Sequence, residues 1–142
     1  MKIQKVSYST YLDTREMAKD LFFLLKPLYC HVLIDEEWYE CIIPEGFITD
    51  YCSVPRVPLA YTLFGGKYNR TGTFHDALYS DWKEIKIVHA ASREELPITK
   101  ELADGILYKS LVDEGAWSTT AYSMWLGVHT FGSMFYKRLD KK

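Results

Sequence analysis

The order of the hydrophobic patterns along the chain constrains its fold more than any other feature of the sequence. Residues 21–48 contain apolar, β-branched runs that are bounded by turn residues, a pattern typical of strands. From Val54 onward the pattern changes, and helical signals follow. Strands first and helices afterwards are typical of the α+β class. We therefore predict a single compact α+β domain over residues 1–142, with N-terminal antiparallel strands followed by three main helices.

The clearest strand prediction is a hairpin at residues 29–43. Two apolar runs are separated there by Asp35-Glu36-Glu37, which make a turn. A further short extended run reaches Asp50. Residues 13–19 are predicted to form a helical turn or an irregular lead-in. The β part of the domain is thus expected at about residues 20–50.

The helical part is expected at about residues 54–138. The predicted helices are a short irregular one at residues 54–64 and regular ones at residues 68–80, 99–114 and 118–138. Thr99 is the predicted N-cap of the third of these, and Gly115 ends it. Between the helices, residues 81–97 are polar and mixed, which predicts a loop or a small hairpin.

Charge and hydropathy exclude two classes of partner. The net charge is −2, so electrostatics give no reason to expect a nucleic-acid partner. Residues 115–136 carry no acidic or basic side chain and are long enough to span a bilayer. Their Ser and Thr residues and His129 favour a core helix instead, so no transmembrane span is expected.

Eleven Tyr and four Trp residues are more than a small core needs, which indicates a protein interface.

The cysteines indicate a reducing compartment. Cys30, Cys41 and Cys52 follow no metal-ligand spacing, and their odd number argues against a secreted disulfide framework. Cys30 and Cys41 could face each other on paired strands, although buried free thiols are the preferred interpretation. The N-terminal residues lack the pattern of a signal peptide. We expect synthesis in the cytoplasm.

Side chains capable of acid–base chemistry gather around one predicted helix. His75 and Tyr79 are four residues apart and therefore share a helix face, while Asp76 points about a quarter-turn away. Asp104 lies at the buried edge of the next helix, where a carboxylate needs a hydrogen-bond donor. His75 is the natural donor. Such a pair fixes the tautomer of the ring and leaves the second nitrogen to take a proton from water.

The neighbouring polar residues allow two interpretations. Asp76 and Asp50 could bind a divalent metal such as calcium, with Ser53, Arg56 and Arg70 in supporting positions. The same groups also suit a purely structural network, because short polar side chains cap turns and an arginine pairs with a nearby aspartate. Both interpretations remain open on the sequence.

Several short motifs resemble one known family. They are residues 46–50, 53–56 and 75–79, Tyr68 with Arg70, Ala103-Asp104, and Phe131-Gly132. Together they resemble a bacteriophage family known as domain of unknown function 1353, over roughly residues 23–136. The resemblance implies a phage or prophage origin and supplies no established activity. The chain departs from the family pattern at Cys52, where the family has a small Ala, and in the insertion at residues 81–97.

A looser likeness suggests a mechanism. The order His75-Asp76-x-x-Tyr79, followed by Asp104, is similar to the core of phospholipases A2. This likeness implies that His75 is the base, Asp76 a calcium ligand, Tyr79 a buttress and Asp104 the group that orients the histidine. The glycine-rich calcium loop and the disulfides of those enzymes have no counterpart in this sequence.

These observations predict a phage-encoded protein that is made in the host cytoplasm. It would act in the virion or at the host envelope during infection, with a metal-assisted, hydrolase-like His/Asp site. One alternative is a non-catalytic virion component of the tail or neck, whose polar cluster is architectural. Another is an inhibitor of a host protein. The expected partners are other virion proteins or further copies of the chain.

Overall fold

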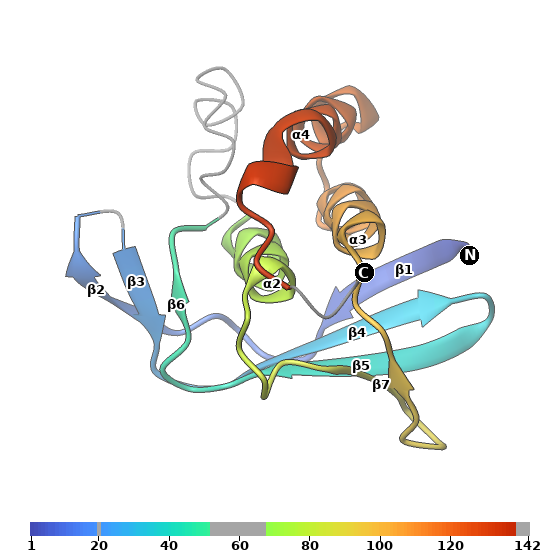
Figure 1. The fold of residues 1–142 in the computed structure, drawn as a ribbon, viewed down its shortest axis with the longest axis horizontal. Helices are drawn as coiled ribbons and strands as arrows, with labels where there is room; N and C mark the ends of the chain where they lie inside the picture. Colours follow the sequence, from blue (N-terminus) through green and yellow to red (C-terminus); the bar gives the residue numbers. More distant parts are fainter. Residues whose placement is uncertain (20, 52–67, 139–142) are drawn as a thin grey trace.

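The computed structural model describes residues 1–19, 21–51 and 68–138 (Figure 1). The predicted short helix at residues 54–64 lies outside these ranges, as do Cys52, Ser53 and Arg56. Within them, antiparallel strands make up the N-terminal part and helices cover one face of the sheet (Figure 1). The predicted α+β class and single compact domain are confirmed.

Antiparallel pairing connects the strands throughout the described ranges. Five strands there form a sheet in the order β1-β4-β5-β7-β8, and three form a smaller sheet in the order β2-β3-β6. The strands are β1 (Ile3–Tyr8), β2 (Thr14–Ala18), β3 (Leu21–Leu24), β4 (Leu28–Ile34), β5 (Glu37–Ile43), β6 (Ile48–Thr49), β7 (Ile87–His89) and β8 (Glu95–Leu96).

The predicted hairpin is β4–β5. Every second side chain of β4, from Leu28 to Ile34, is buried, as expected for a strand with one face on the core. Its turn places Asp35 and Glu36 at φ of 48° and 67°, the positive values that a tight hairpin turn requires at both central residues. Cys30 lies opposite Cys41 in the register, and both are buried free thiols.

Two N-terminal strands were not predicted. Residues 14–18 form β2 rather than the expected helical turn or irregular lead-in. Four of its five residues are exposed, so its extended conformation comes from pairing with β3 rather than from a buried face of its own. In β1 only Val6 is fully buried, which leaves the alternating pattern of a strand too weak to recognise.

Within the described ranges the helices are α2 (Asn69–Tyr79), α3 (Lys100–Asp113) and α4 (Ser118–Phe131), and a short 3-10 turn, η1 (Gly132–Met134), follows. The Thr99 side chain accepts a hydrogen bond from the Leu102 amide at 3.1 Å, so it is the N-cap as predicted. Gly115, with φ of +105°, follows the end of α3. Of the two predictions for residues 81–97, the small hairpin is correct, since β7 pairs with β8.

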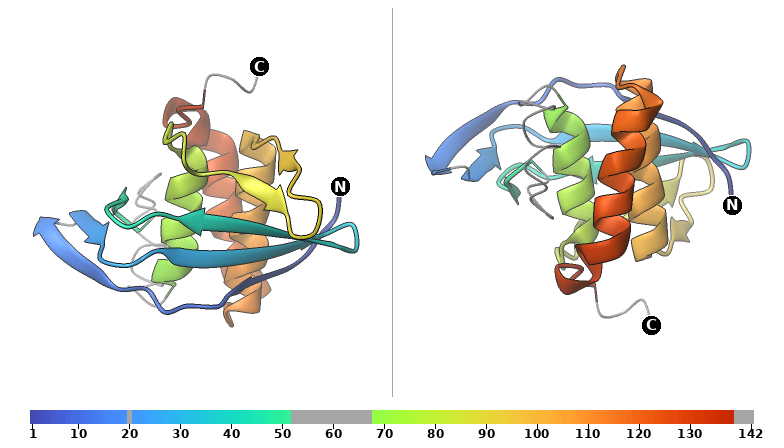
Figure 2. Two further views of the ribbon diagram at one scale, coloured as in Figure 1. Left: turned by 90° about the horizontal axis from the view of Figure 1, so that it is seen from below. Right: turned by 90° about the horizontal axis from the view of Figure 1, so that it is seen from above.

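The helices form two layers on the sheet. In Figures 1 and 2, α2 and α3 lie side by side against one face of the sheet, and α4 packs on α3 on the side away from the sheet. Helix α2 packs against α3 and β6, and eight of its eleven residues are buried. One core cluster joins residues of β1, β4, β5, α2 and α3. In the described part of the chain, no helix combines the length and the apolar character of a membrane span.

Candidate functional site

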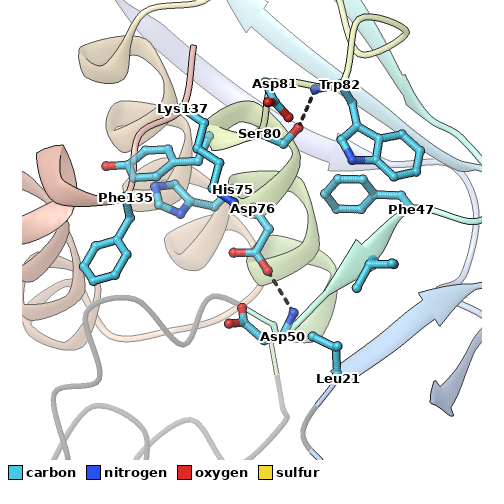
Figure 3. A pocket seen from close by; sticks show the side chains of 12 residues that line it. Leu21, Phe47, Asp50, His75, Asp76, Ser80, Asp81, Trp82, Phe135 and Lys137 are labelled. Carbon is cyan, nitrogen blue, oxygen red and sulfur yellow. Dashed lines mark hydrogen bonds between the residues drawn. The ribbon is translucent and has the colours of Figure 1, made fainter. Parts of the chain in front are cut away.

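Helix α2 presents the two aromatic groups of the predicted site on one face. The rings of His75 and Tyr79 lie 4.2 Å apart between centroids. His75 is 2% exposed, because its position on α2 faces α3. Asp76 projects from the flank of the helix toward solvent-accessible space (Figure 3). The i, i+4 spacing therefore gives the side-chain arrangement expected from the sequence.

Asp104 on α3 completes the pair. Its Oδ1 atom lies 3.1 Å from Nε2 of His75, and the phenol of Tyr79 donates to the same oxygen at 2.6 Å. The carboxylate is 3% exposed, so the protein replaces nearly all of its water. The predicted proximity of His75 and Asp104 is therefore present, with Tyr79 on the same side of the helix.

Lys100 was not predicted and is part of the same cluster. Its Nζ donates to Oδ2 of Asp104 at 2.8 Å and to the carbonyl oxygens of Val128 at 3.0 Å and His129 at 3.4 Å. The two carbonyls belong to the last turn of α4, where a cation is favoured by the helix dipole. The i, i+4 spacing of Lys100 and Asp104 on one helix was the sequence signal that could have found this contact.

The surroundings of Asp104 favour its ionised form. Burial alone would raise its pKa, but the hydrogen bonds from His75, Lys100 and Tyr79 outweigh this effect and hold the pKa below its ordinary value. An ionised carboxylate can only accept hydrogen bonds, so Nε2 of His75 must carry the proton of their shared bond. In the neutral ring, Nδ1 is then the nitrogen with the lone pair.

A pocket of about 510 Å³ opens beside this cluster (Figure 3). It has an apolar wall and a polar wall, and the polar wall includes the rings of His75 and Tyr79. Its lining residues are Leu21, Phe47, Ile48, Asp50, His75, Asp76, Tyr79, Ser80, Asp81, Trp82, Phe135 and Lys137. Phe47 and Trp82 meet edge to face at 5.2 Å on the apolar side. His75 and Tyr79 therefore form part of a pocket wall that a small substrate could reach, and Asp104 lies behind them.

The two predicted metal ligands lie together at this pocket. Oδ2 of Asp76 accepts from the hydroxyl of Thr49 at 2.6 Å and from the backbone amide of Asp50 at 3.2 Å. This pairing fixes the end of β6 against α2. Among the described residues, no three His, Cys, Asp or Glu side chains are arranged to hold a metal ion. Calcium takes six to eight oxygen ligands, so two carboxylates alone do not complete such a site.

The structure does not bring Arg70, one of the predicted supporting residues, to the His–Asp pair. Arg70 forms an ion pair with Glu114 at 3.1 Å, donates to the Thr10 carbonyl and lies over the ring of Tyr8. Together with Glu114 it lines a separate pocket near β1. The reason is helical periodicity, because a residue five positions before His75 is rotated by roughly 140° around α2.

Residues after α4 enclose Tyr79. A Cβ atom on Gly132 would collide with the phenol oxygen of Tyr79, so this position requires glycine. The ring of Tyr136 meets the Tyr79 ring edge to face at 5.1 Å, and the amide of Lys137 donates to the Tyr79 carbonyl at 2.9 Å. The predicted last helix therefore ends at Phe131 rather than near Arg138, because the chain turns at Gly132 to pack against α2.

The fold and the site define an α+β domain with a buried His–Asp pair, of which the histidine lines a pocket. The model of the family described as "Protein of unknown function (DUF1353)" matches residues 22–128, and the chain belongs to this family. The resemblance noted in the sequence motifs is thereby confirmed at the level of the family. Comparisons with curated proteins and with solved structures gave no match.

Proposed function

We propose that the chain is a phage-encoded hydrolase that is used in the virion or at the host envelope during infection. The observation that carries the hydrolase proposal is the hydrogen bond between Asp104 and His75, a histidine that lines a pocket. The phage role rests on the resemblance of the sequence motifs to a bacteriophage family.

In the proposed reaction, His75 acts as a general base on water. Nδ1 takes a proton from a water molecule while the water oxygen bonds to the carbonyl carbon of an ester or amide. The bond to the leaving group then breaks, and the imidazolium returns its proton to the leaving oxygen or nitrogen. The products are a carboxylic acid and an alcohol or amine. Asp104 holds the ring through Nε2–H and stabilises the imidazolium as it forms.

The test compares histidine variants on defined substrates. We expect the wild type to hydrolyse at least one of p-nitrophenyl butyrate, phospholipid vesicles or peptidoglycan. His75→Asn should lower the rate by roughly 100-fold or more, since general bases contribute about that much. His31→Asn is the matched control, because His31 bonds to Ser9 and does not line the pocket. Equal losses in both variants, or no hydrolysis of any substrate, would contradict the proposal.

Calcium assistance at Asp50 and Asp76 is a separate part of the prediction. The described residues supply too few ligands, so no step of the proposed reaction passes through a metal. Metal analysis of purified protein, together with unfolding of the wild type and Asp76→Asn with added calcium, tests this part. Stabilisation of the wild type alone would support a metal at Asp76.

A second candidate function is a non-catalytic tail or neck component. The observation that favours it is the way Asp104 joins two donors on α2 to Lys100, which in turn bonds to α4. Such a network also suits an architectural role. For this candidate, Asp104→Asn should lower stability and infectivity in proportion, and sedimentation should detect ring-shaped oligomers.

A further inference from the structure

Lys100 is the point at which the His–Asp pair meets the outer helix. An ammonium group has three N–H donors, and the structure gives Lys100 three acceptors: Oδ2 of Asp104 and the carbonyl oxygens of Val128 and His129. Its side chain is 22% exposed, compared with 3% for Asp104. Lys100 therefore connects a buried carboxylate on α3 to the last turn of α4.

We propose that Lys100 is a positioning residue of this site, which holds the plane of the Asp104 carboxylate in the orientation that directs one of its oxygens at His75. The inference rests on the proposed role of His75. It adds a residue that touches neither the pocket nor a substrate and acts through Asp104.

The two oxygens of the Asp104 carboxylate accept from different donors, and this arrangement supports the role of Lys100. Oδ1 accepts from the two α2 side chains, His75 and Tyr79, whereas Oδ2 accepts from Lys100. Among the described residues, Lys100 is the donor to Oδ2. The terminal torsion of an aspartate has a broad preference, so the side chain alone does not fix the angle of the carboxylate plane relative to His75. Removal of the ammonium would release that torsion.

The charges around Asp104 agree with the geometry. The titratable groups that face it are His75 and Tyr79 from α2 and Lys100 from its own helix, and Tyr136 packs behind Tyr79. Burial raises the pKa of Asp104, and the bonds from His75, Lys100 and Tyr79 lower it further than burial raises it. Loss of the Lys100 bond should therefore move the pKa of Asp104 upward.

The experiment follows Asp104 and His75 by NMR in Lys100→Gln and Lys100→Arg. In Lys100→Gln, the Asp104 carboxyl carbon should titrate at higher pH than in the wild type, and the His75 ring nitrogens should show a mixture of tautomers. Lys100→Arg keeps the positive charge and should restore part of the wild-type pattern. Unchanged carboxyl titration and ring-nitrogen shifts in Lys100→Gln would overturn the proposal.

The chain offers a matched control on the same helix. Lys109 pairs with Asp113 at 3.5 Å with the same i, i+4 spacing, away from the His–Asp pair. Lys109→Gln should leave the Asp104 and His75 signals unchanged. If it changes them as much as Lys100→Gln does, the effect is a general response of α3 and the proposal is wrong.

A further test uses the wild-type protein alone, so its result does not depend on whether a variant folds. The Lys100 ammonium should give a resolved nitrogen signal under conditions where exposed lysines are broadened by exchange with water. If the Lys100 signal is broadened as much as the signals of exposed lysines, the inference is wrong.

The two proposals can fail independently of each other. If the Asp104 titration depends on Lys100 but no substrate is hydrolysed, only the hydrolase proposal is contradicted. Hydrolysis that needs His75 and is unchanged in Lys100→Gln contradicts only the role of Lys100.

Discussion

At the scale of single residues, the site depends on how Asp104 replaces its lost water. A carboxylate that is 3% exposed is stable only if other donors take the place of solvent. His75, Tyr79 and Lys100 supply these donors from two helices. The carboxylate is thus both the orienting group of the proposed base and the centre of a buried network, and the two roles predict different responses to substitution.

Asp104→Asn should destabilise the fold. The substitution keeps the shape of the side chain but turns one acceptor oxygen into an NH₂ donor, which cannot satisfy both Lys100 and the α2 donors. We expect the free energy of unfolding to fall by about 3 kcal/mol, as for the loss of one partner of a buried ionic network. Urea unfolding measures this change. An unchanged midpoint would show that the network contributes little to stability.

The acid sensitivity of the fold should also depend on Asp104. Its pKa in the folded chain lies below the ordinary value of 3.8, so the unfolded chain binds a proton first as the pH falls. The stabilising contribution is therefore complete above pH 3.8 and is lost as the pH falls through the folded pKa. Between pH 5 and pH 2, thermal unfolding should show a smaller decrease in stability for Asp104→Asn than for the wild type.

Sequence reasoning found part of this site because helical spacing is regular. Spacing alone placed His75 and Tyr79 on one face, and the need of a buried carboxylate for a donor linked Asp104 to His75. Lys100 was missed because a Lys–Asp pair at i, i+4 is usually an exposed surface pair. Only the packing of α4 over α3 shows that this pair is partly buried.

At the scale of elements, a close backbone contact fixes the end of β6 against α2. A Cβ atom on Gly72 would lie 2.6 Å from both the carbonyl carbon and the carbonyl oxygen of Tyr51. Tyr51 itself has φ of 60°, a left-handed backbone conformation that residues other than glycine rarely adopt. This contact holds the neighbouring Asp50 amide on Asp76, so Gly72 positions the polar wall of the pocket.

Gly72→Ala should therefore destabilise the protein even though Ala is the better helix former. The helix gains about 1 kcal/mol in propensity, but displacement of a backbone segment costs about 1–3 kcal/mol. Gly105→Ala on α3 is the matched control, because its Cβ would meet only the flexible Cδ1 end of Ile3. We expect a lower melting temperature for Gly72→Ala and an unchanged or higher one for Gly105→Ala. Equal melting temperatures would contradict the close contact.

The elements that the sequence predicted well carry their own buried pattern. The β4–β5 hairpin shows alternating burial, and α3 has a capping residue and a glycine that mark its ends. By contrast, β2 is extended because β3 pairs with it, and α4 ends where Tyr79 leaves room only for a glycine. These features depend on contacts between distant segments, which local patterns do not contain.

At the scale of the whole molecule, the sheet shares one hydrophobic core with α2 and α3. Buried side chains from β1, β4 and β5 pack with those of α2 and α3 in a single cluster. If either the sheet or the helix pair α2–α3 unfolded alone, the apolar side chains of the other would be exposed to water. We expect one cooperative transition in which far-UV and near-UV circular dichroism give the same midpoint. A near-UV signal lost well before the helical signal would contradict a shared core.

The contacts of Lys100 with α4 also bear on when the His–Asp pair can form during synthesis. Helices α2 and α3 leave the ribosome before α4, because they precede it in the chain. Until α4 docks, Lys100 lacks two of its acceptors, and Tyr79 lacks the packing of Tyr136. A nascent chain that ends before α4 would hold the groups of the site in an unfinished arrangement. Completion of the network around the His–Asp pair is therefore a late event, because it needs the last helix.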